Sequence, residues 1–422
     1  MSQVYKDIKS DNQIWKFCFY GLLKNLKFFE PYLLIYLLGM GFNLFNIGIL
    51  YSIREIITYV FEVPSGVFAD NYGKKKELMI CFTFYIISFV FFFIGSTFNI
   101  LVIAMMCFGL GEAFRSGTHK AMIYSFLEQK GWFEYKAFVY GRTRSFSLLG
   151  SAISAFLSII FILNLPSARW IFLICVIPYV MDFILIWSYP DSLDERRHNE
   201  LNLKKFFMES FIQLKKIIFN TTLNKLLVSS SLYDGIFKTI KDYIQPILKI
   251  AVLASAASSL TGLEGEKLVK IYLGITYGVF YIFSSVASKN VYRLNKIANS
   301  NRLMVISFDV MAVLLLLLSL AIKNNVTTII IGLFFILYVL KDGRRPIFVD
   351  VCGDYMEKNQ RATVLSVDSQ LRALFTVILA PAFGFIADRY YIGILFLCIA
   401  ILILIVNRFL YIPKQSAKIV PK

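Results

Sequence analysis

Three acidic residues lie inside apolar stretches where membrane-spanning helices are predicted, and they are candidates for binding protons. Glu55 and Glu62 occur in the predicted span 45–69, and Glu30 occurs in the predicted span 17–40. Because Glu55 and Glu62 are seven residues apart, a helix places them about 20° out of line, on one face. Burial disfavours a charged carboxylate, so such a residue can take up a proton near neutral pH.

Each of these acids also has a structural interpretation. A neighbouring base such as Arg54 can neutralise Glu55, and Glu62 can belong to a structural motif at the inner end of its helix. Glu30 can pair locally with Lys27, three residues before it. Both interpretations remain open for all three acids.

Charged and polar residues of both signs occur in three further apolar stretches, where they are candidates for lining a substrate cavity. An ionisable group at membrane depth costs roughly 2.5–3.5 kcal/mol, so it faces a cavity or a partner by default. The candidates are Glu112, Arg115 and His119 in 99–126; Asp234, Lys238, Lys241, Asp242 and Gln245 in 223–250; and Lys341 and Asp342 in 326–351. The residues in 223–250 have the spacing of one helix face. A Glu112–Arg115 pair within one helix is an equally simple interpretation.

The mixture of signs predicts a polar, anionic or zwitterionic substrate at least as well as a lipophilic cation. It does not predict an enzyme, because the chain shows no nucleophile–base motif and no phosphate-binding glycine loop. The chain has two histidines, and its six cysteines show no paired spacing, so we expect no metal site and no cofactor.

The elements that must position these residues are membrane-spanning helices. Of the 422 residues, 58% are hydrophobic and 17% are charged, and the apolar residues form about a dozen windows of roughly 20 residues. The spans are 17–40, 45–69, 77–95, 99–126, 138–163, 168–189, 223–250, 267–289, 302–322, 326–351, 362–386 and 390–411. This pattern predicts an all-α integral membrane protein embedded in a lipid bilayer.

Basic residues concentrate in alternate loops and in both terminal segments. The loops around 74–76, 130–136, 196–216, 289–296 and 358–361 carry them, whereas 39–43 and 96–99 have none. Because positive loops stay in the cytoplasm, both termini are expected there, which requires an even number of spans. The net charge of +17 therefore sets topology, and we expect no nucleic-acid partner. We expect a monomer in a bacterial cell membrane.

The polar segment between the sixth and seventh spans divides the chain into halves. We expect an N-terminal six-helix half over 1–189, a cytoplasmic linker with an amphipathic helix over 190–222, and a C-terminal six-helix half over 223–422. Two such halves with a substrate site between them form a layout typical of secondary transporters.

The segment EVPSGVFADNYGKKK at 62–76 resembles the loop signature between the second and third helices of the major facilitator superfamily. The matching residues are Gly66, Asp70, Gly73, Lys74 and Lys75. The resemblance implies the major facilitator fold, and it implies that Asp70 lies near the N-terminus of the eleventh helix, close to Arg361. A carboxylate there would hold a cytoplasmic gate shut, and Gly66 would allow the close approach.

Two other features qualify the resemblance. GFIAD at 384–388 is similar to GVFAD at 66–70, but it falls at the outer end of its span, so we do not expect a second functional copy. The fifth span lacks the Gly-Pro-x-x-Gly-Gly pattern that is common in drug antiporters. The chain is nevertheless loosely similar to tetracycline-efflux proteins of low-GC bacteria.

The expected function is secondary active transport by alternating access, as proton-coupled export of a drug-like or polar small molecule. Such an antiporter would act in efflux and antibiotic resistance. Proton-coupled uptake of a polar metabolite is a second possibility. A membrane receptor that derives from a transporter and moves nothing is a third.

Overall fold

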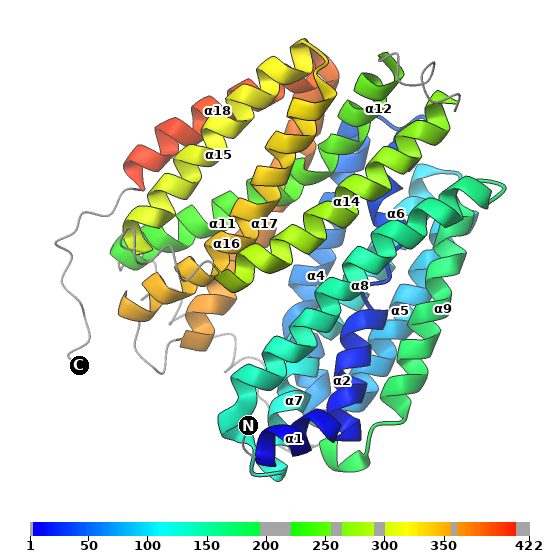
Figure 1. Cartoon of the computed structure of the whole chain (residues 1–422), viewed down its shortest axis with the longest axis vertical. Coiled ribbons are helices and arrows are strands. Elements are labelled where there is room, and N and C mark those ends of the chain that lie inside the picture. The colour runs from blue at the N-terminus through cyan, green and yellow to red at the C-terminus, as the bar shows by residue number, and fades with distance from the viewer. Residues whose placement is uncertain (1–2, 195–220, 255–263, 291–299, 356–360, 411–422) are drawn as a thin grey trace. The chain divides into compact units, whose positions relative to one another are not determined.

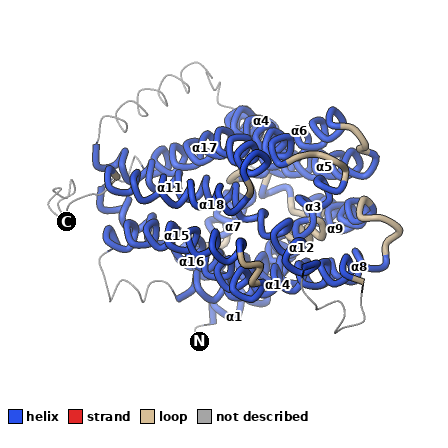
Figure 2. The backbone as a smooth tube through the Cα atoms, turned by 90° about the horizontal axis from the view of Figure 1, so that it is seen from above, coloured by secondary structure: helices blue, strands red, loops and turns tan. Residues whose placement is uncertain are grey.

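The computed structural model describes residues 3–194, 221–254, 264–290, 300–355 and 361–410, and every regular element in them is helical (Figures 1 and 2). The N-terminal elements are α1 Gln3–Ser10, α2 Asn12–Leu23, η1 Glu30–Tyr32, α3 Leu33–Gly39, α4 Leu44–Tyr72, α5 Lys74–Ile94, α6 Phe98–Arg115, α7 Thr118–Gln129, η2 Phe133–Tyr135, α8 Lys136–Asn164, α9 Trp170–Trp187 and η3 Asp191–Leu193. The C-terminal elements are α11 Thr221–Ile240, η4 Lys241–Tyr243, α12 Ile244–Ala254, α14 Gly265–Asn290, α15 Ser300–Lys323, α16 Thr327–Tyr355, α17 Arg361–Tyr390 and α18 Ile392–Phe409.

Three of the predicted spans are interrupted rather than continuous. The first is broken at 24–29 between α2 and η1, and the seventh contains the 3₁₀ turn η4 between α11 and α12. The fourth is broken at Ser116–Gly117, where Gly117 has a left-handed backbone with φ 79° that favours glycine. Predicting one straight helix over 17–40, 99–126 and 223–250 was therefore wrong at these points.

Helix pairing repeats between the two parts of the chain. In the N-terminal part α2 packs on α8, and α5 packs on both α6 and α9. In the C-terminal part α11 packs on α17, and α15 packs on both α16 and α18. The first and fifth, third and fourth, and third and sixth spans of each part are thus paired in the same way.

The described residues form two compact units. Unit 1 comprises those in Met1–Tyr36, Ile53–Glu200 and Leu273–Ile282, and unit 2 comprises those in Leu37–Ser52, Leu201–Tyr272 and Phe283–Lys422. The helix α4 is shared, because its first residues belong to unit 2 and the remainder to unit 1. Most of the expected linker, residues 195–220, and its amphipathic helix lie outside the described residues.

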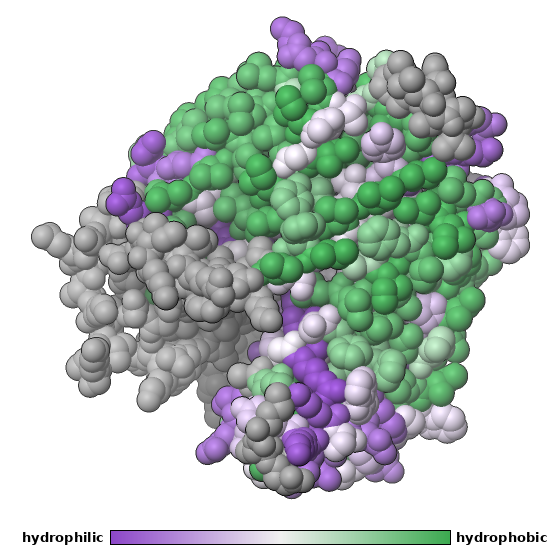
Figure 3. All heavy atoms as spheres, in the orientation of Figure 1, coloured by the Kyte–Doolittle hydropathy of each residue, from purple (hydrophilic) through white to green (hydrophobic). Residues whose placement is uncertain are grey.

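Among the described residues, nine helical stretches are long and apolar enough to cross a membrane. Much of their apolar surface is exposed, as at Ile177, Trp187 and Ile378, which is the surface expected to face lipid. Figure 3 shows apolar residues over the middle of α8 and α9, and hydrophilic residues gathered at the end of unit 1 where α1 lies. The predicted spans absent from these nine, 17–40, 223–250 and 326–351, are interrupted or rich in charge.

Within unit 2, the start of α4 lies against the end of α17. The Asp388 carboxylate accepts hydrogen bonds from the backbone N–H groups of Leu44 at 3.0 Å and Phe45 at 2.8 Å. A Cβ added at Gly48 would lie 2.7 Å from the carbonyl carbon of Ala380, so the helices meet at backbone distance. Asp388 belongs to the GFIAD segment, and it stabilises the N-terminus of α4 with a negative charge.

Candidate functional site

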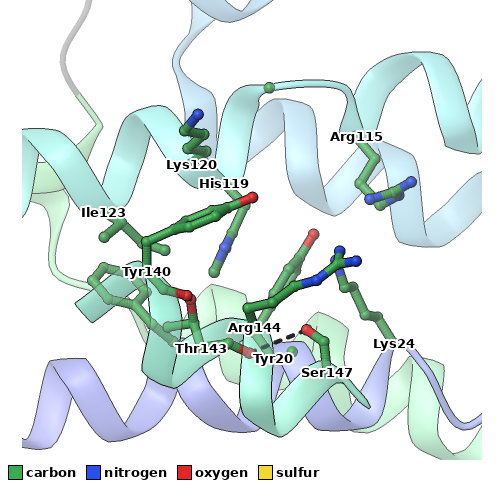
Figure 4. Close-up of a pocket in the computed structure, with 13 residues that line it drawn as sticks. Tyr20, Lys24, Arg115, His119, Lys120, Ile123, Tyr140, Thr143, Arg144 and Ser147 are labelled. Atoms are coloured by element: carbon green, nitrogen blue, oxygen red, sulfur yellow. Dashed lines mark hydrogen bonds between the residues drawn. The ribbon is translucent and has the colours of Figure 1, made fainter. Parts of the chain in front are cut away.

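A cavity of about 250 Å³ opens in unit 1 between α2, the α6–α7 junction and α8. The residues that line it include five that carry or can carry positive charge: Lys24, Arg115, His119, Lys120 and Arg144. Among the described residues, no acidic side chain lines it. Figure 4 shows Lys24 and Arg144 reaching into the cavity from different helices, with Arg115 at its edge.

The break between α6 and α7 shapes this cavity. Gly117 is the N-cap of α7 and forms no side-chain capping bond, and Gly117, His119 and Lys120 all line the cavity. The first backbone N–H groups of a helix have no intrahelical acceptor and carry partial positive charge. The start of α7 therefore adds to the positive character of the cavity.

Glu112 holds Arg115 at the edge of the cavity. The Arg115 guanidinium forms a hydrogen-bonded ion pair with Glu112, and its Nε donates to the Tyr85 hydroxyl at 3.2 Å. Lys27 Nζ lies 3.4 Å from the other Glu112 oxygen. The predicted pair within the fourth span is present, and Lys27 joins it.

His119 is fixed by aromatic neighbours rather than by a carboxylate. Its ring stacks on Tyr20 with centroids 3.6 Å apart and lies edge-on to Phe17 at 5.4 Å. Its Nε2 lies 3.3 Å from the Tyr189 hydroxyl. One continuous helix over 99–126 would place Arg115 and His119, four residues apart, on the same face. The break at Gly117 removes that geometry, yet both residues still line the same cavity.

The predicted proton-binding acids occupy three different surroundings. Glu55 is 5% exposed and pairs with Arg54, whose Nη2 lies 3.1 Å from Glu55 Oε1. Glu62 accepts a hydrogen bond of 2.7 Å from the Ser116 hydroxyl, at the break beside the cavity. Glu30 begins η1, just after the break in the first span. The ion pair with Arg54 is the contact that the structural interpretation of Glu55 requires.

The loop motif is tied to the segment that follows α9. Gly73 has φ 103°, and the Lys75 backbone N–H donates to Asp194 Oδ1 at 2.9 Å. Lys75 Nζ donates to the Tyr189 carbonyl oxygen at 2.8 Å and Asp191 Oδ1 at 3.0 Å. These contacts explain the glycine and one lysine of the motif by local structure.

Other members of the motif have different outcomes. Lys74 Nζ lies 3.4 Å from the Ser125 hydroxyl oxygen. Around Gly66, no described atom lies within 4 Å of the position that a Cβ would occupy. The close approach of the eleventh helix to Gly66 remains a prediction. The Arg361 side chain lies outside the described residues, and its contact with Asp70 remains a prediction.

The polar stripe of the seventh span lies in unit 2, where η4 divides it. Asp242 and Gln245 are buried, and Lys241 Nζ pairs with Asp242 Oδ1 at 2.9 Å. Asp234 and Lys238 lie on α11, before the interruption. The five residues therefore do not share one continuous helix face as predicted.

Unit 2 also contains a buried charge network. Asp368 is fully buried and accepts hydrogen bonds from Arg345 and from Arg372 Nη2, the latter at 3.1 Å. Asp234 lies 3.7 Å from Arg372 Nη1 and 4.0 Å from Arg345 Nη1. Two acids and two bases thus join α11, α16 and α17. Such a network is stable only while both signs are present.

The tenth span contributes two further cations of different character. Arg344 is 2% exposed, donates to the Ser307 hydroxyl at 3.0 Å and the Ser229 hydroxyl at 3.1 Å, and lies over the Tyr233 ring. Lys341 pairs with Asp342 at 2.9 Å. Lys341 and Asp342 therefore balance each other next to the network without belonging to it.

The structure adds residues that the sequence candidates omitted. Arg144 lines the cavity and Asp368 anchors the network, and both lie inside predicted spans, so the charge criterion could have found them. Two more acids are fully buried, Glu77 in α5 and Asp182 in α9. Glu77 accepts a 2.6 Å hydrogen bond from Thr118 at the start of α7.

Comparison with known proteins identifies the family. Residues 17–369 match the profile of the Major Facilitator Superfamily. The chain is 26% identical over 402 residues to "Uncharacterized MFS-type transporter YxaM" of Bacillus subtilis (strain 168), covering 93% of this chain and 92% of that protein.

Solved structures of the nucleoside transporter NupG have the same fold. A mutant of NupG matches with a TM-score of 0.79 and 13% identity, covering 94% of this chain and 99% of that one. A second NupG structure matches with a TM-score of 0.76 and 12% identity, covering 95% and 98%. The family match, the helical architecture and the apolar spans agree, and the chain belongs to the major facilitator superfamily of membrane transporters.

Proposed function

We propose that this protein is a proton-coupled secondary active transporter that exports a polar small molecule by alternating access. The observation that carries the proposal is the cation-lined cavity of unit 1 in a chain of this family. Buried charges at membrane depth are costly and mark substrate or ion pathways in such proteins. We further propose that it acts as a monomer in the cell membrane with both termini in the cytoplasm.

The polar contacts around the cavity favour a solute that forms hydrogen bonds. Lys24, Arg144 and the start of α7 offer donors within a space enclosed partly by aromatic rings. A small number of placed polar groups in a partly apolar pocket is typical of small-molecule sites. In unit 2, Lys238 and the Lys241–Asp242 pair remain candidates for contacting the substrate.

Proton coupling is assigned to the acids of α4 and the first span. Glu62 supports this best, because its carboxylate accepts from Ser116 at the α6–α7 break that also shapes the cavity. Glu55 lies two helical turns before Glu62 and is paired with Arg54. A proton on either carboxyl group would weaken these bonds and thereby couple protonation to helix movement. Glu30 remains a third candidate beside the break in the first span.

Alternating access needs contacts that close one side and yet break readily. The bonds from the α4 N-terminus to Asp388 fit this requirement, because they involve one exposed carboxylate and two backbone N–H groups. Under the proposed topology they lie on the outer side. We assign the opposite role to Asp70, at the cytoplasmic end of α4, with the N-terminus of α17 as its partner.

The export direction is part of the proposal, and the position of the cavity under this topology agrees with it. Its lining residues include those of α7 and the first half of α8, which adjoin the basic loops expected in the cytoplasm. An exporter must collect its solute from that side.

The test is proton movement in liposomes that contain the purified protein and a trapped pH-sensitive dye. Phenyl phosphate, uridine and tetracycline are loaded inside or added outside, under an imposed pH gradient. We expect at least one of them to drive a proton flux opposite to its own movement, absent from protein-free liposomes. Co-movement with protons would establish uptake by symport instead, and no solute-dependent flux with any of the three would contradict proton-coupled transport.

A further inference from the structure

We propose that the cavity of unit 1 binds a small organic oxyanion, a carboxylate or a phosphate ester, and this assignment rests on the transport function proposed above. The charge of the cavity lining favours an anion. Lys24, Lys120 and Arg144 line the cavity, and none of its described lining residues is acidic. Glu112 of α6 and Asp182 of α9 are not among the lining residues.

One cation of the cavity is already compensated. Arg115 is paired with Glu112, which also receives Lys27, so that group of three contributes one net positive charge. Lys24 and Arg144 therefore supply the charge that a ligand would meet first. Figure 4 shows both side chains directed into the cavity, whereas Lys120 points away from its centre.

The start of α7 also favours an anion, independently of the side-chain charges. This helix has 12 residues, and its N-cap Gly117 offers no side-chain acceptor to the first backbone N–H groups. Thr118, the first residue of α7, directs its hydroxyl to Glu77 instead. An oxyanion in the cavity could accept from these N–H groups, as anions do at helix N-termini.

The size and the surface of the cavity favour a small organic ligand. The volume of about 250 Å³ lies just below the roughly 300–1,000 Å³ that is usual for drug-sized ligands. Phe17, Tyr20 and Tyr140 contribute aromatic surface to the lining. The cavity therefore suits a small anion with an organic body better than a large drug. An inside-negative membrane potential drives such an anion outward, which agrees with export.

The test is ligand binding to the purified full-length protein in nanodiscs, measured by isothermal titration calorimetry. Benzoate and phenyl phosphate present the two oxyanions on the same ring, and benzamide is the neutral counterpart of benzoate. We expect one or both anions to bind and benzamide not to bind. Arg144→Gln and Lys24→Gln should each weaken anion binding about tenfold or more, because each removes a charge-assisted hydrogen bond.

Lys136→Gln is the matched control, because it removes the same charge from α8 outside the cavity lining. It should leave anion binding unchanged. Binding of neither anion, or equal loss in Lys136→Gln and Arg144→Gln, would overturn the site. Nanodiscs of phosphatidylcholine and of phosphatidylglycerol separate a soluble ligand from a lipid headgroup. Similar affinity in both supports a soluble ligand, and loss in phosphatidylglycerol would show that a headgroup fills the cavity and overturn the soluble substrate.

The oxyanion site and the proposed transport function can be contradicted independently of each other. If the protein exchanges protons for uridine but binds neither anion, the transport function is supported and the oxyanion site is contradicted. If the protein binds phenyl phosphate through Arg144 but moves no solute in liposomes, the site is supported and the transport function is contradicted.

Discussion

Replacing Asp388 by asparagine tests whether its contact with the α4 N-terminus holds one side of the transporter closed. The carboxylate accepts from Leu44 and Phe45, whereas the Asn43 side chain already accepts from the next N–H group. Asparagine keeps one acceptor oxygen and loses the charge and the second acceptor. The side chain is exposed, so the charge–helix term is at the low end, about 0.3–1 kcal/mol.

Together with one lost hydrogen bond, worth about 0.5–1.5 kcal/mol, the substitution should cost about 1 kcal/mol. That corresponds to a roughly fivefold shift of the population away from the state that contains this contact. Spin labels on Ser96→Cys and Asn324→Cys, at loops expected on the outer side, report the separation by electron double resonance. We expect the ratio of the long-distance to the short-distance population to rise about fivefold in the Asp388→Asn protein.

The control is Arg389→Gln, which changes the charge of an exposed neighbour on the same helix and should leave the distances as they are. The thermal unfolding temperature should change little, because the substitution shifts the balance between two folded conformations and does not disrupt the core. An identical distance distribution in the Asp388→Asn and unsubstituted proteins would refute a closing role for Asp388.

Three further substitutions test other parts of the molecule. Glu55→Gln should abolish uphill transport in proteoliposomes while calorimetric solute binding persists, and undiminished uphill transport would remove Glu55 from proton coupling. Asp70→Asn should enrich the state open to the cytoplasm, with little loss of folded protein, as read by spin labels across the cytoplasmic face; unchanged distances would leave Asp70 without a gating role. Asp368→Asn removes the buried carboxylate that accepts from the partly exposed Arg345 and Arg372 and should cost about 1.5–3 kcal/mol of stability, so an unchanged denaturation midpoint would count against the network.

The sequence predicted the helices well because each span carries a long apolar run, and hydropathy alone marks such runs. It did not predict where three spans break. The break at Gly117 had a local signal in the Ser-Gly pair, which favours a turn. The breaks at 24–29 and 241–243 also had a signal, because Pro31 and Pro246 follow them, and proline is tolerated in the first turn of a helix but not in its interior.

The charged candidates could be recognised because they lie inside apolar spans. Their partners on other helices could not be predicted. Arg345 and Asp368 are 23 residues apart on different helices, so spacing along the chain gives no reason to pair them. Arg144 falls in an apolar span like the other candidates, but only folding brings it to the cavity with Lys24. Side-chain partners across helices are set by packing, which a single sequence does not contain.

The segment 384–388 also shows that the sequence does not reveal which residues contact each other. Its similarity to 66–70 was visible, and its place at the outer end of a span argued against a functional copy. The structure brings Asp388 to the N-terminus of α4, a carboxylate-to-helix contact of the kind that the family resemblance implied for Asp70. The residue type was informative, and its partner could not be read from the chain.

The most direct test of alternating access is whether the cavity can be reached from both sides of the membrane. Ser147 lines the cavity, so Ser147→Cys places a thiol there, in a background where the exposed Cys398 is replaced by serine. A membrane-impermeant thiol reagent is applied to right-side-out and inside-out vesicles. We expect labelling from both sides, reduced by phenyl phosphate. Labelling from one side only, whatever the pH gradient, would contradict alternating access to this cavity.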